Sequence, residues 1–304
     1  MWNILIATEK PFAASASDKI KEVASSHEDI SLHFLEAYES EVDLLNAVGD
    51  KDALIIRSDK ITNEVIEAAP RLKLVVRAGS GYDNVDLNAA SARDIVVMNT
   101  PGQNANAVAE LAFGLMVTMI RGQFNGKPGS ELGGKTLGLH GYGNIGHCMA
   151  RIALGFEMKI LAYDPYVSEV GQGVEILDSV TDLYKKSDFV SLSIPANSET
   201  INSINYELLL NAKDDLVLIN TARQEIIDEE GLVSIMKEKE FFRFCSDIAP
   251  SNKDELLELF RNRCLFTKKK MGAQTREANS NAGVAAINQT IDFFKTGNKT
   301  FQVN

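Results

Sequence analysis

The 304-residue chain has few of the residues that build disulfide-bonded or metal-binding proteins. Its three cysteines, Cys148, Cys245 and Cys264, are odd in number, far apart and include no CxxC pair. Its four histidines all lie in the first half, and none follows His147. The scattered cysteines indicate reduced side chains in a reducing compartment, which predicts a cytoplasmic protein. A metal site is not expected, and a histidine-based site in the second half is excluded.

Long apolar runs and an excess of positive charge are also missing. No run approaches the ~20 apolar residues that a membrane-spanning helix needs. The first residues, MWNILIATEKPF, lack the basic segment and cleavage site of a signal peptide. The net charge of −11 disfavours nucleic acid or an anionic membrane as a partner. A small anionic ligand would therefore need positive side chains gathered locally.

The sequence is rich in apolar strand-like runs that alternate with amphipathic helical stretches. In the first hundred residues the runs are NILIAT, ALIIRS, KLVVRAG and IVVMN. The alternation restarts after Lys135 with TLGLHG, KILAYD, FVSLSIP, LVLINTA, FRFCSDIA and CLFT. Long helices are predicted from about Asn104 to Gly122 and from about Thr275 to Phe294. This pattern predicts an α/β protein with two domains, each a doubly wound parallel sheet.

A glycine-rich turn stands at the start of the second series. Gly141, Gly143 and Gly146 form a GxGxxG motif that follows a strand and opens a helix, and the next strand ends in Asp164. The glycines permit a tight turn and a close backbone approach, and the helix N-terminus favours a pyrophosphate. Asp164 would accept hydrogen bonds from ribose hydroxyls and repel a 2′-phosphate. The motif predicts a site for NAD rather than NADP.

Further motifs resemble the D-2-hydroxyacid dehydrogenase family over essentially the whole chain, most closely its short phosphoglycerate dehydrogenases. They are RAGSGYDNVDL, NTPGQNANAVAE, the glycine motif, NTARQEIIDEEGL, SDIAP and MGAQTREA. The resemblance implies a Rossmann-type NAD-binding domain of residues 101–273. It also implies a flavodoxin-like substrate domain of residues 1–100 and 274–304, with a cleft between the two domains.

The resemblance implies an enzyme that oxidises D-3-phosphoglycerate to 3-phosphohydroxypyruvate with NAD, the first step of serine biosynthesis. Two alternatives stay open: a reductase of hydroxypyruvate, glyoxylate or another 2-keto acid, and a catalytically silent NADH-sensing partner protein. Family precedent predicts a homodimer, with the helix after Asn104 as either a dimer face or buried core. The regulatory C-terminal domain of longer relatives is not expected.

The family pattern also assigns substrate contacts. Arg223, in NTAR, is implied to grip a carboxylate with two hydrogen bonds and to polarise the reacting oxygen. Gly79, Ser80 and Gly81 are implied to hold the substrate carboxylate with backbone N–H groups. Further substrate candidates, each also compatible with a structural role, are Arg57, Ser58, Asn104 and Lys10.

For the cofactor, the resemblance implies pyrophosphate contacts from the amides of Asn144 and Ile145 and a nicotinamide contact from Asp247. The remaining cofactor candidates are Ile194, Pro195, Thr221, Ala222 and Gly272. This chain has Ser193 where the family often has His, and Gln224 where it often has Gly.

The stretch LFTKKKMGAQTREA departs from the family at the catalytic position. Most members use a Glu-supported His, but the Glu position falls near Asn252 and the His position reads Lys. Counting back from MGAQTREA gives Lys270, and counting forward from Thr267 gives Lys269. We favour Lys270 as the acid/base group and keep Lys269 as the alternative. A plain solvated lysine turn is the competing interpretation.

Overall fold

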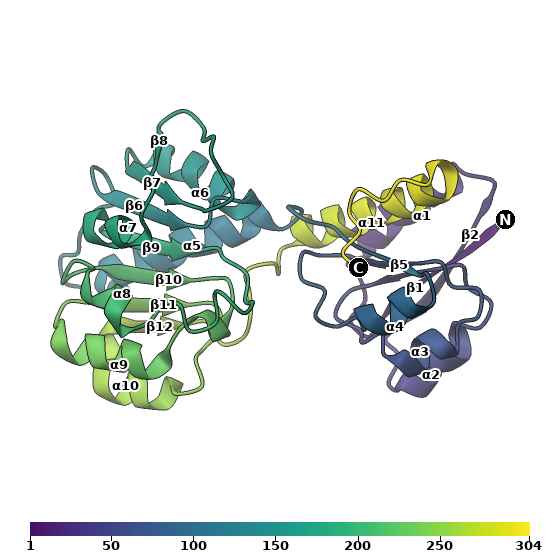
Figure 1. Ribbon diagram of the computed structural model, residues 1–304, viewed down its shortest axis with the longest axis horizontal. Coiled ribbons are helices and arrows are strands. Elements are labelled where there is room, and N and C mark those ends of the chain that lie inside the picture. The colour runs from purple at the N-terminus through teal and green to yellow at the C-terminus, as the bar shows by residue number, and fades with distance from the viewer. The chain divides into compact units, whose positions relative to one another are not determined.

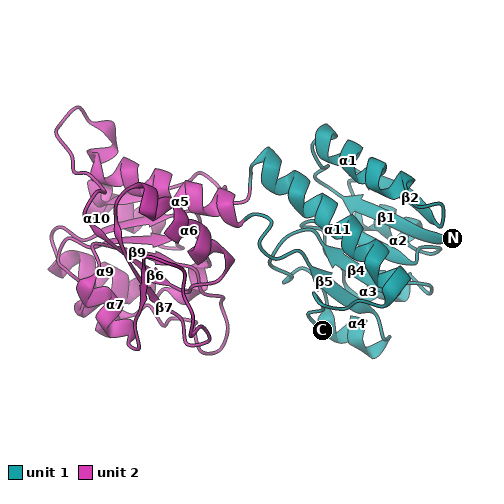
Figure 2. Cartoon of the chain, turned by 90° about the horizontal axis from the view of Figure 1, so that it is seen from above, with its two compact units in different colours: residues 1–104, 274–304 teal, residues 105–273 magenta.

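The computed structural model describes residues 1–304, the whole of the sequence. The chain divides into two compact units, shown in Figure 2. Unit 1 consists of residues 1–104 and 274–304, and unit 2 consists of residues 105–273. The division falls at residue 104, where the sequence predicted residue 100. No helix of the protein is both long enough and apolar enough to span a bilayer.

Unit 1 contains a five-stranded parallel sheet with the strand order β2-β1-β3-β4-β5. The strands are β1 (Trp2–Thr8), β2 (Ile30–Glu36), β3 (Ala53–Ile56), β4 (Leu74–Arg77) and β5 (Val96–Asn99). The apolar side chains of β1, β3, β4 and β5 alternate between the two faces of the sheet, so both faces must be covered.

Helices cover both faces of the unit 1 sheet (Figure 1). One face packs against α1 (Ala14–Ser25) and α11 (Arg276–Thr296), which brings the last helix beside the first. The other face packs against α2 (Glu41–Ala47), α3 (Asn63–Glu67) and α4 (Leu87–Ala92). The sequence sets the ends of α11 locally: the Thr275 hydroxyl accepts from the Ala278 N–H, and Gly297 ends the helix with a φ of 74°.

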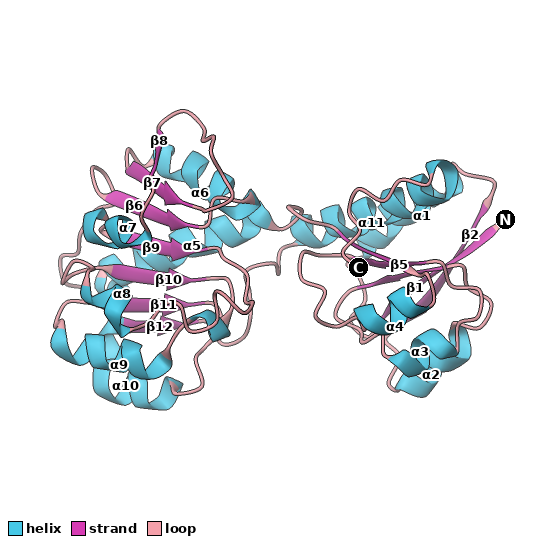
Figure 3. Cartoon of the chain, viewed as in Figure 1, coloured by secondary structure: helices cyan, strands magenta, loops and turns pink.

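Unit 2 contains a seven-stranded parallel sheet with the order β12-β11-β10-β9-β6-β7-β8 (Figure 3). The strands are β6 (Thr136–His140), β7 (Lys159–Tyr163), β8 (Val174–Ile176), β9 (Phe189–Leu192), β10 (Val217–Asn220), β11 (Arg243–Ser246) and β12 (Cys264–Phe266). From β6, the chain adds β7 and β8 on one side and β9 to β12 on the other. Such a reversal places ligands at the carboxyl ends of the strands.

The helices of unit 2 also form two layers. The α5 (Ala105–Ile120) and α6 (Asn144–Gly155) helices pack on one face of the sheet. The other face carries α7 (Val180–Lys186), α8 (Tyr206–Leu210), α9 (Glu229–Glu238) and α10 (Lys253–Phe260). Short 3-10 turns span Gly122–Phe124, Gln224–Ile226 and Arg261–Arg263. Most apolar side chains of α5 lie in the core of unit 2, so this helix serves as core, one of its two predicted roles.

The predicted fold class, two doubly wound parallel-sheet α/β domains, is confirmed. Two strands, β2 and β8, were not among the predicted runs. Both lie at a sheet edge and have half-exposed side chains rather than a continuous apolar run.

Candidate active site

The glycine motif forms a turn that only glycine fits at two of its three positions. Gly141 has a φ of 97°, and a Cβ there would lie 2.8 Å from the Ser193 carbonyl oxygen. A Cβ on Gly146 would lie 2.8 Å from the Gly141 carbonyl oxygen. Gly143, the N-cap of α6, is exposed and has open space around its Cβ position. The turn is thus closed by Gly141 and Gly146, and the backbone at Gly143 is left accessible to a ligand.

Asp164 is tied to the same turn. One carboxylate oxygen accepts from the Tyr142 N–H at 2.8 Å, and the other accepts from the Tyr166 N–H at 3.0 Å. A carboxylate offers about four lone-pair sites, so acceptor capacity remains for ribose hydroxyls. The residues predicted to meet the pyrophosphate, Asn144 and Ile145, begin α6 directly after the turn. This donor and acceptor set fits a dinucleotide.

The other predicted cofactor residues follow neighbouring strands at the same edge. Ile194 and Pro195 follow β9, and the Ile194 side chain lies beside Gly141. Thr221 and Ala222 follow β10 and are buried, and the Thr221 hydroxyl makes no hydrogen bond within the protein. Parallel strands end together, so the fold brings these segments to one edge of the unit 2 sheet. Their cofactor contacts stay predictions.

Arg223 stands on a turn that Asn220 shapes. The Asn220 side chain accepts from the Ala222 N–H at 2.9 Å and donates to the Arg223 carbonyl at 2.7 Å. The half-buried Arg223 guanidinium donates to the Ala222 carbonyl at 3.0 Å. Sequence reasoning missed Asn220, although an Asn that bonds the backbone two residues onward is a known turn signal.

Asp247, one residue beyond β11, holds the loop that carries the lysine run. Its buried carboxylate accepts from the N–H groups of Met271 and Gly272, both at 2.7 Å, and from the Thr267 hydroxyl at 3.0 Å. Gly272 is buried close to this carboxylate, since a Cβ there would lie 3.0 Å from an Asp247 oxygen. The predicted nicotinamide contact of Asp247 stays a prediction, and Thr267 is a site-shaping residue that the sequence did not reveal.

The three lysines follow β12 in this loop. Lys268, Lys269 and Lys270 are all exposed in unit 2. The Lys269 carbonyl oxygen lies 2.8 Å from Thr267 Oγ1, so the loop folds back on itself before Lys270. The assignment of the acid/base role to Lys270 or Lys269 therefore stays a prediction, based on sequence register.

Unit 1 carries the predicted carboxylate-binding loop after β4. Gly79 has a φ of 152°, and its carbonyl accepts from the Thr100 N–H at 2.9 Å. The Ser80 hydroxyl donates to the Asn104 side chain at 3.1 Å, and the Ser80 carbonyl accepts from the Asn99 amide at 2.7 Å. These hydrogen bonds fix the backbone of Gly79 and Ser80, and the next residue, Gly81, is half-exposed.

Arg57 follows β3 and organises the turn after β1. Its guanidinium donates to the Lys10 carbonyl at 2.8 Å, to the Pro11 carbonyl at 3.1 Å and to the Asn279 side chain. Burial lowers the pKa of Arg57, and nearby Asp59 opposes this shift. The Lys10 and Ser58 side chains are exposed. The guanidinium therefore has a structural role, and its predicted substrate contact would use its remaining N–H donors.

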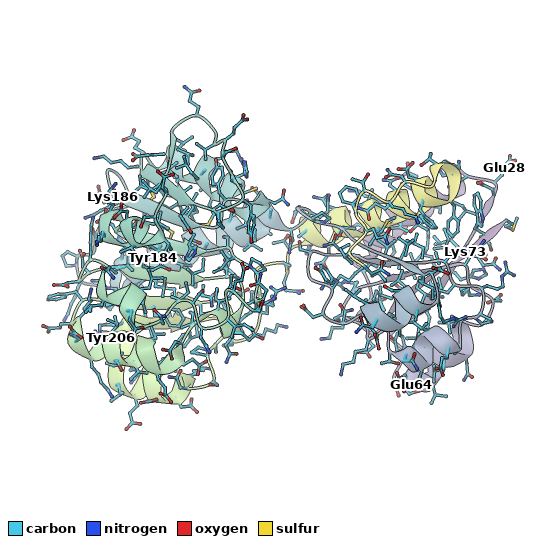
Figure 4. The ribbon with its side chains drawn as sticks, viewed as in Figure 1. Glu28, Glu64, Lys73, Tyr184, Lys186 and Tyr206 are labelled. Carbon is cyan, nitrogen blue, oxygen red and sulfur yellow. The ribbon has the colours of Figure 1, made fainter.

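His140, the last residue of β6, is a buried imidazole beside the glycine turn. Its Nδ1 lies 3.2 Å from the hydroxyl of Tyr184, which Figure 4 labels in unit 2. Burial lowers the pKa of His140 to about 4, although Asp164 opposes the shift. The imidazole is therefore neutral near neutral pH and packs rather than titrates. No group of three or more His, Cys, Asp or Glu side chains that could bind a metal ion is present.

Comparison with known proteins agrees with this geometry. Residues 107–267 match the family described as D-isomer specific 2-hydroxyacid dehydrogenase, NAD binding domain. A crystal structure of NAD⁺-bound 3-phosphoglycerate dehydrogenase from Entamoeba histolytica aligns with 42% identity and a TM-score of 0.89, covering 100% of this chain and 98% of that chain.

Two curated relatives point to neighbouring activities. A hydroxypyruvate reductase of Thermotoga maritima is 38% identical over 262 residues, which cover 81% of this chain and 85% of the relative. A D-3-phosphoglycerate dehydrogenase of Methanocaldococcus jannaschii is 36% identical over 267 residues, which cover 81% of this chain and 50% of the relative. The chain thus spans about half the length of the curated phosphoglycerate dehydrogenases that it matches.

A Rossmann-type unit with this glycine turn, joined to a second parallel-sheet unit, defines an NAD-dependent oxidoreductase. The family match covers just over half of the chain, and relatives above 30% identity cover about four-fifths of it. The chain belongs to the D-2-hydroxyacid dehydrogenase family and is an NAD-dependent 2-hydroxyacid dehydrogenase similar to phosphoglycerate dehydrogenases.

Proposed function

We propose that this dehydrogenase oxidises D-3-phosphoglycerate to 3-phosphohydroxypyruvate, the first step of serine biosynthesis, with Lys270 as the acid/base group. The loop of residues 267–272 carries the proposal, because Asp247 fixes the backbone directly after Lys270 at the edge where Arg223 also emerges. No histidine follows His147, so the histidine that most family members use in this region is absent, and we propose that a lysine amine replaces it.

Each side chain has a defined task in this proposal. NAD, which the glycine turn and Asp164 would hold, would supply the hydride acceptor for the substrate carbon. The neutral Lys270 amine takes the hydroxyl proton during oxidation, and the ammonium returns it during reduction. The Arg223 guanidinium grips the carboxylate and stabilises charge on the reacting oxygen. An amine has no tautomer to fix, so the Glu that relatives carry near position 252 is not required.

The phosphate group of the substrate gives a role to the positively charged candidate residues. Phosphoglycerate has two anionic ends, and the chain has a strongly negative net charge. Lys10, Arg57 and the lysine run are the positive groups next to strand ends that we propose to attract it. The backbone N–H groups of residues 79–81 are proposed to hold the carboxylate.

A second candidate activity is the reduction of hydroxypyruvate or glyoxylate. The 38% identity to a hydroxypyruvate reductase over most of both chains favours it. The two activities share the carboxylate, the reacting carbon and the proton transfer, and differ only in the phosphate. Selectivity for phosphate is therefore the property that separates them.

A spectrophotometric assay of NADH oxidation tests the proposal. We expect kcat/KM with 3-phosphohydroxypyruvate to exceed that with hydroxypyruvate or glyoxylate by at least ~100-fold, because a buried or clamped phosphate contributes several kcal/mol. Equal or better turnover of hydroxypyruvate would assign the second activity. Tight NADH binding without turnover of any 2-keto acid would instead indicate an NADH-sensing protein.

We also propose a homodimer and a cytoplasmic location. All three cysteines are free thiols, and Cys245 and Cys264 are buried, as expected for a protein of a reducing compartment.

The homodimer is tested by light scattering coupled to size-exclusion chromatography, which gives the mass of the protein in solution directly. A value near twice the chain mass of 33.3 kDa supports the dimer, and a value near 33.3 kDa contradicts it.

A further inference from the structure

The first turn of α9 contains a carboxylate that accepts four hydrogen bonds. One oxygen of Glu229 accepts from the Gln224 side chain at 2.9 Å and from the Ser251 N–H at 2.8 Å. The other oxygen accepts from the Ser251 hydroxyl and from the Asn252 N–H at 3.2 Å. The half-buried Glu229 carboxylate thus satisfies four donors with two oxygens, which uses its ordinary acceptor capacity.

These donors come from two loops that follow neighbouring strands. Gln224 follows Arg223 in the connection between β10 and α9. Ser251 and Asn252 belong to the connection between β11 and α10, which begins with Asp247. Glu229 therefore connects the loop that carries Arg223 to the loop of residues 247–252, in which Asp247 holds the lysine segment.

Two of these contacts lie at positions where the chain departs from its family. The family often has Gly at position 224, and glycine has no side chain that could donate to Glu229. The position of the Glu that supports a catalytic His in most members falls near Asn252. Here the Asn252 backbone is held by Glu229, and the buried Asn252 side-chain oxygen makes no hydrogen bond. A carboxylate is therefore present in this region, but its lone pairs are directed at loop backbone and side-chain donors.

The ionised form of Glu229 is the form that the network requires. Burial raises the pKa of this carboxyl, but the hydrogen bonds from Ser251, Gln224 and Asn252 outweigh it and leave the pKa below its usual value. Hydrogen bonds to a charged acceptor are about twice as strong as neutral ones. The negative charge also lies in the first turn of α9, where the helix dipole favours it.

We propose that Glu229 is a positioning residue that holds Arg223 in place for the substrate carboxylate by bracing the Gln224 side of its turn. Asn220 braces the other side through the Ala222 N–H and the Arg223 carbonyl. This inference rests on the proposed role of Arg223, and it assigns to Glu229 a function in substrate binding that acts through that arginine.

The test compares E229Q with the matched variant E230Q. Both residues lie in the first turn of α9, and both changes remove one negative charge, but Glu230 is exposed and its side chain makes no hydrogen bond to either loop. In E229Q one oxygen becomes an NH₂ group that faces the Ser251 and Asn252 donors. We expect the KM for 3-phosphohydroxypyruvate to rise about 10-fold in E229Q, while its NADH affinity stays within about twofold of wild type. In E230Q we expect both quantities to be unchanged.

A double-mutant cycle with R223A separates positioning from general stability. If Glu229 acts through Arg223, E229Q changes kcat/KM by less than about twofold in the R223A background. Independent, multiplicative losses would overturn the inference, as would a wild-type KM in E229Q. Should E229Q fail to fold, Q224A removes one brace and is expected to raise KM in the same direction, while a wild-type KM in Q224A overturns the inference.

The outcomes also separate this inference from the proposed function. Near-wild-type kcat/KM in R223A would remove the role of the arginine itself and with it the proposed mechanism. A large loss in R223A together with normal kinetics in E229Q would leave the proposed function intact and reject only the role of Glu229.

Discussion

Replacing Asp247 by Asn is expected to release the loop that carries Lys270. The buried Asp247 carboxylate accepts from the Met271 and Gly272 N–H groups at 2.7 Å and from the Thr267 hydroxyl. An Asn side chain keeps one acceptor oxygen and places an NH₂ group opposite one of the two backbone donors. The substitution therefore removes a charge-assisted hydrogen bond and leaves a buried N–H without an acceptor.

The size of the effect follows from these contacts. A hydrogen bond to a charged group contributes about 1.5–3 kcal/mol, and an unsatisfied buried donor costs about 1–3 kcal/mol. Even a loss of ~2 kcal/mol shifts a local opening equilibrium by about 30-fold, because each 1.4 kcal/mol is a factor of ten. Because Lys270 directly precedes Met271, we expect turnover to fall as well, by up to a similar factor, since only the closed population is active.

Amide hydrogen exchange of Met271 and Gly272 reports this opening directly, with turnover measured in parallel. The matched control is D254N, which removes the same charge from an exposed residue in the first turn of α10. Exchange about 30-fold faster in D247N and unchanged in D254N is the expected result. Exchange in D247N at the wild-type rate would refute the view that Asp247 fixes the loop.

Two further predictions concern the glycine turn. Burial lowers the pKa of His140 to about 4, so the folded protein takes up this proton at a lower pH than the unfolded chain does. The stability from the neutral imidazole is complete above about pH 6.5 and is lost as the pH falls towards 4. The loss of unfolding free energy between pH 7 and 4.5 should therefore be ~2–3 kcal/mol smaller in H140L than in the wild type, and an equal loss contradicts this. G143A should fold like wild type, since nothing lies within 4 Å of its Cβ position, yet it should bind NADH at least ~10-fold more weakly in a fluorescence titration. G141A should also lose thermal stability, because its Cβ would lie 2.8 Å from the Ser193 carbonyl oxygen. Unchanged NADH affinity in G143A would argue against pyrophosphate binding at this turn.

Much of the fold could be predicted because most strands are buried on both faces. The run ALII in β3 is apolar throughout and VLIN in β10 is apolar up to its last residue, and both are fully buried, which is the pattern of a central parallel strand. The edge strands β2 and β8 were missed because their side chains are only half-buried, whereas the edge strand β5 is almost fully buried and was predicted. Periodicity detects burial, so it detects half-buried strands poorly.

The candidate site was predictable only where a residue type has a defined backbone role. The glycine turn and Asp164 could be recognised because a positive φ, a close approach and a strand-end acid follow from local sequence. The braces at Thr267 and Glu229 could not, because they depend on which loops the sheet order brings together. Asn220 was missed although its contacts are local. Arg57 shows the reverse: its position after a strand indicated a ligand contact, while its contacts fix the turn at Lys10 and Pro11.

Single-turnover oxidation of NADH by 3-phosphohydroxypyruvate, both bound to K270M, tests the central claim most directly, with K268M as a matched control from the same exposed run and K269M as the alternative register. A positioned acid/base group contributes about 10²–10⁴-fold to the rate of proton-coupled steps. At saturating substrate the account predicts that K270M slows NADH oxidation by at least ~100-fold with NADH affinity unchanged. K268M, whose proposed role is limited to attracting the substrate, should then react at nearly the wild-type rate. A K270M rate within about twofold of wild type would contradict it.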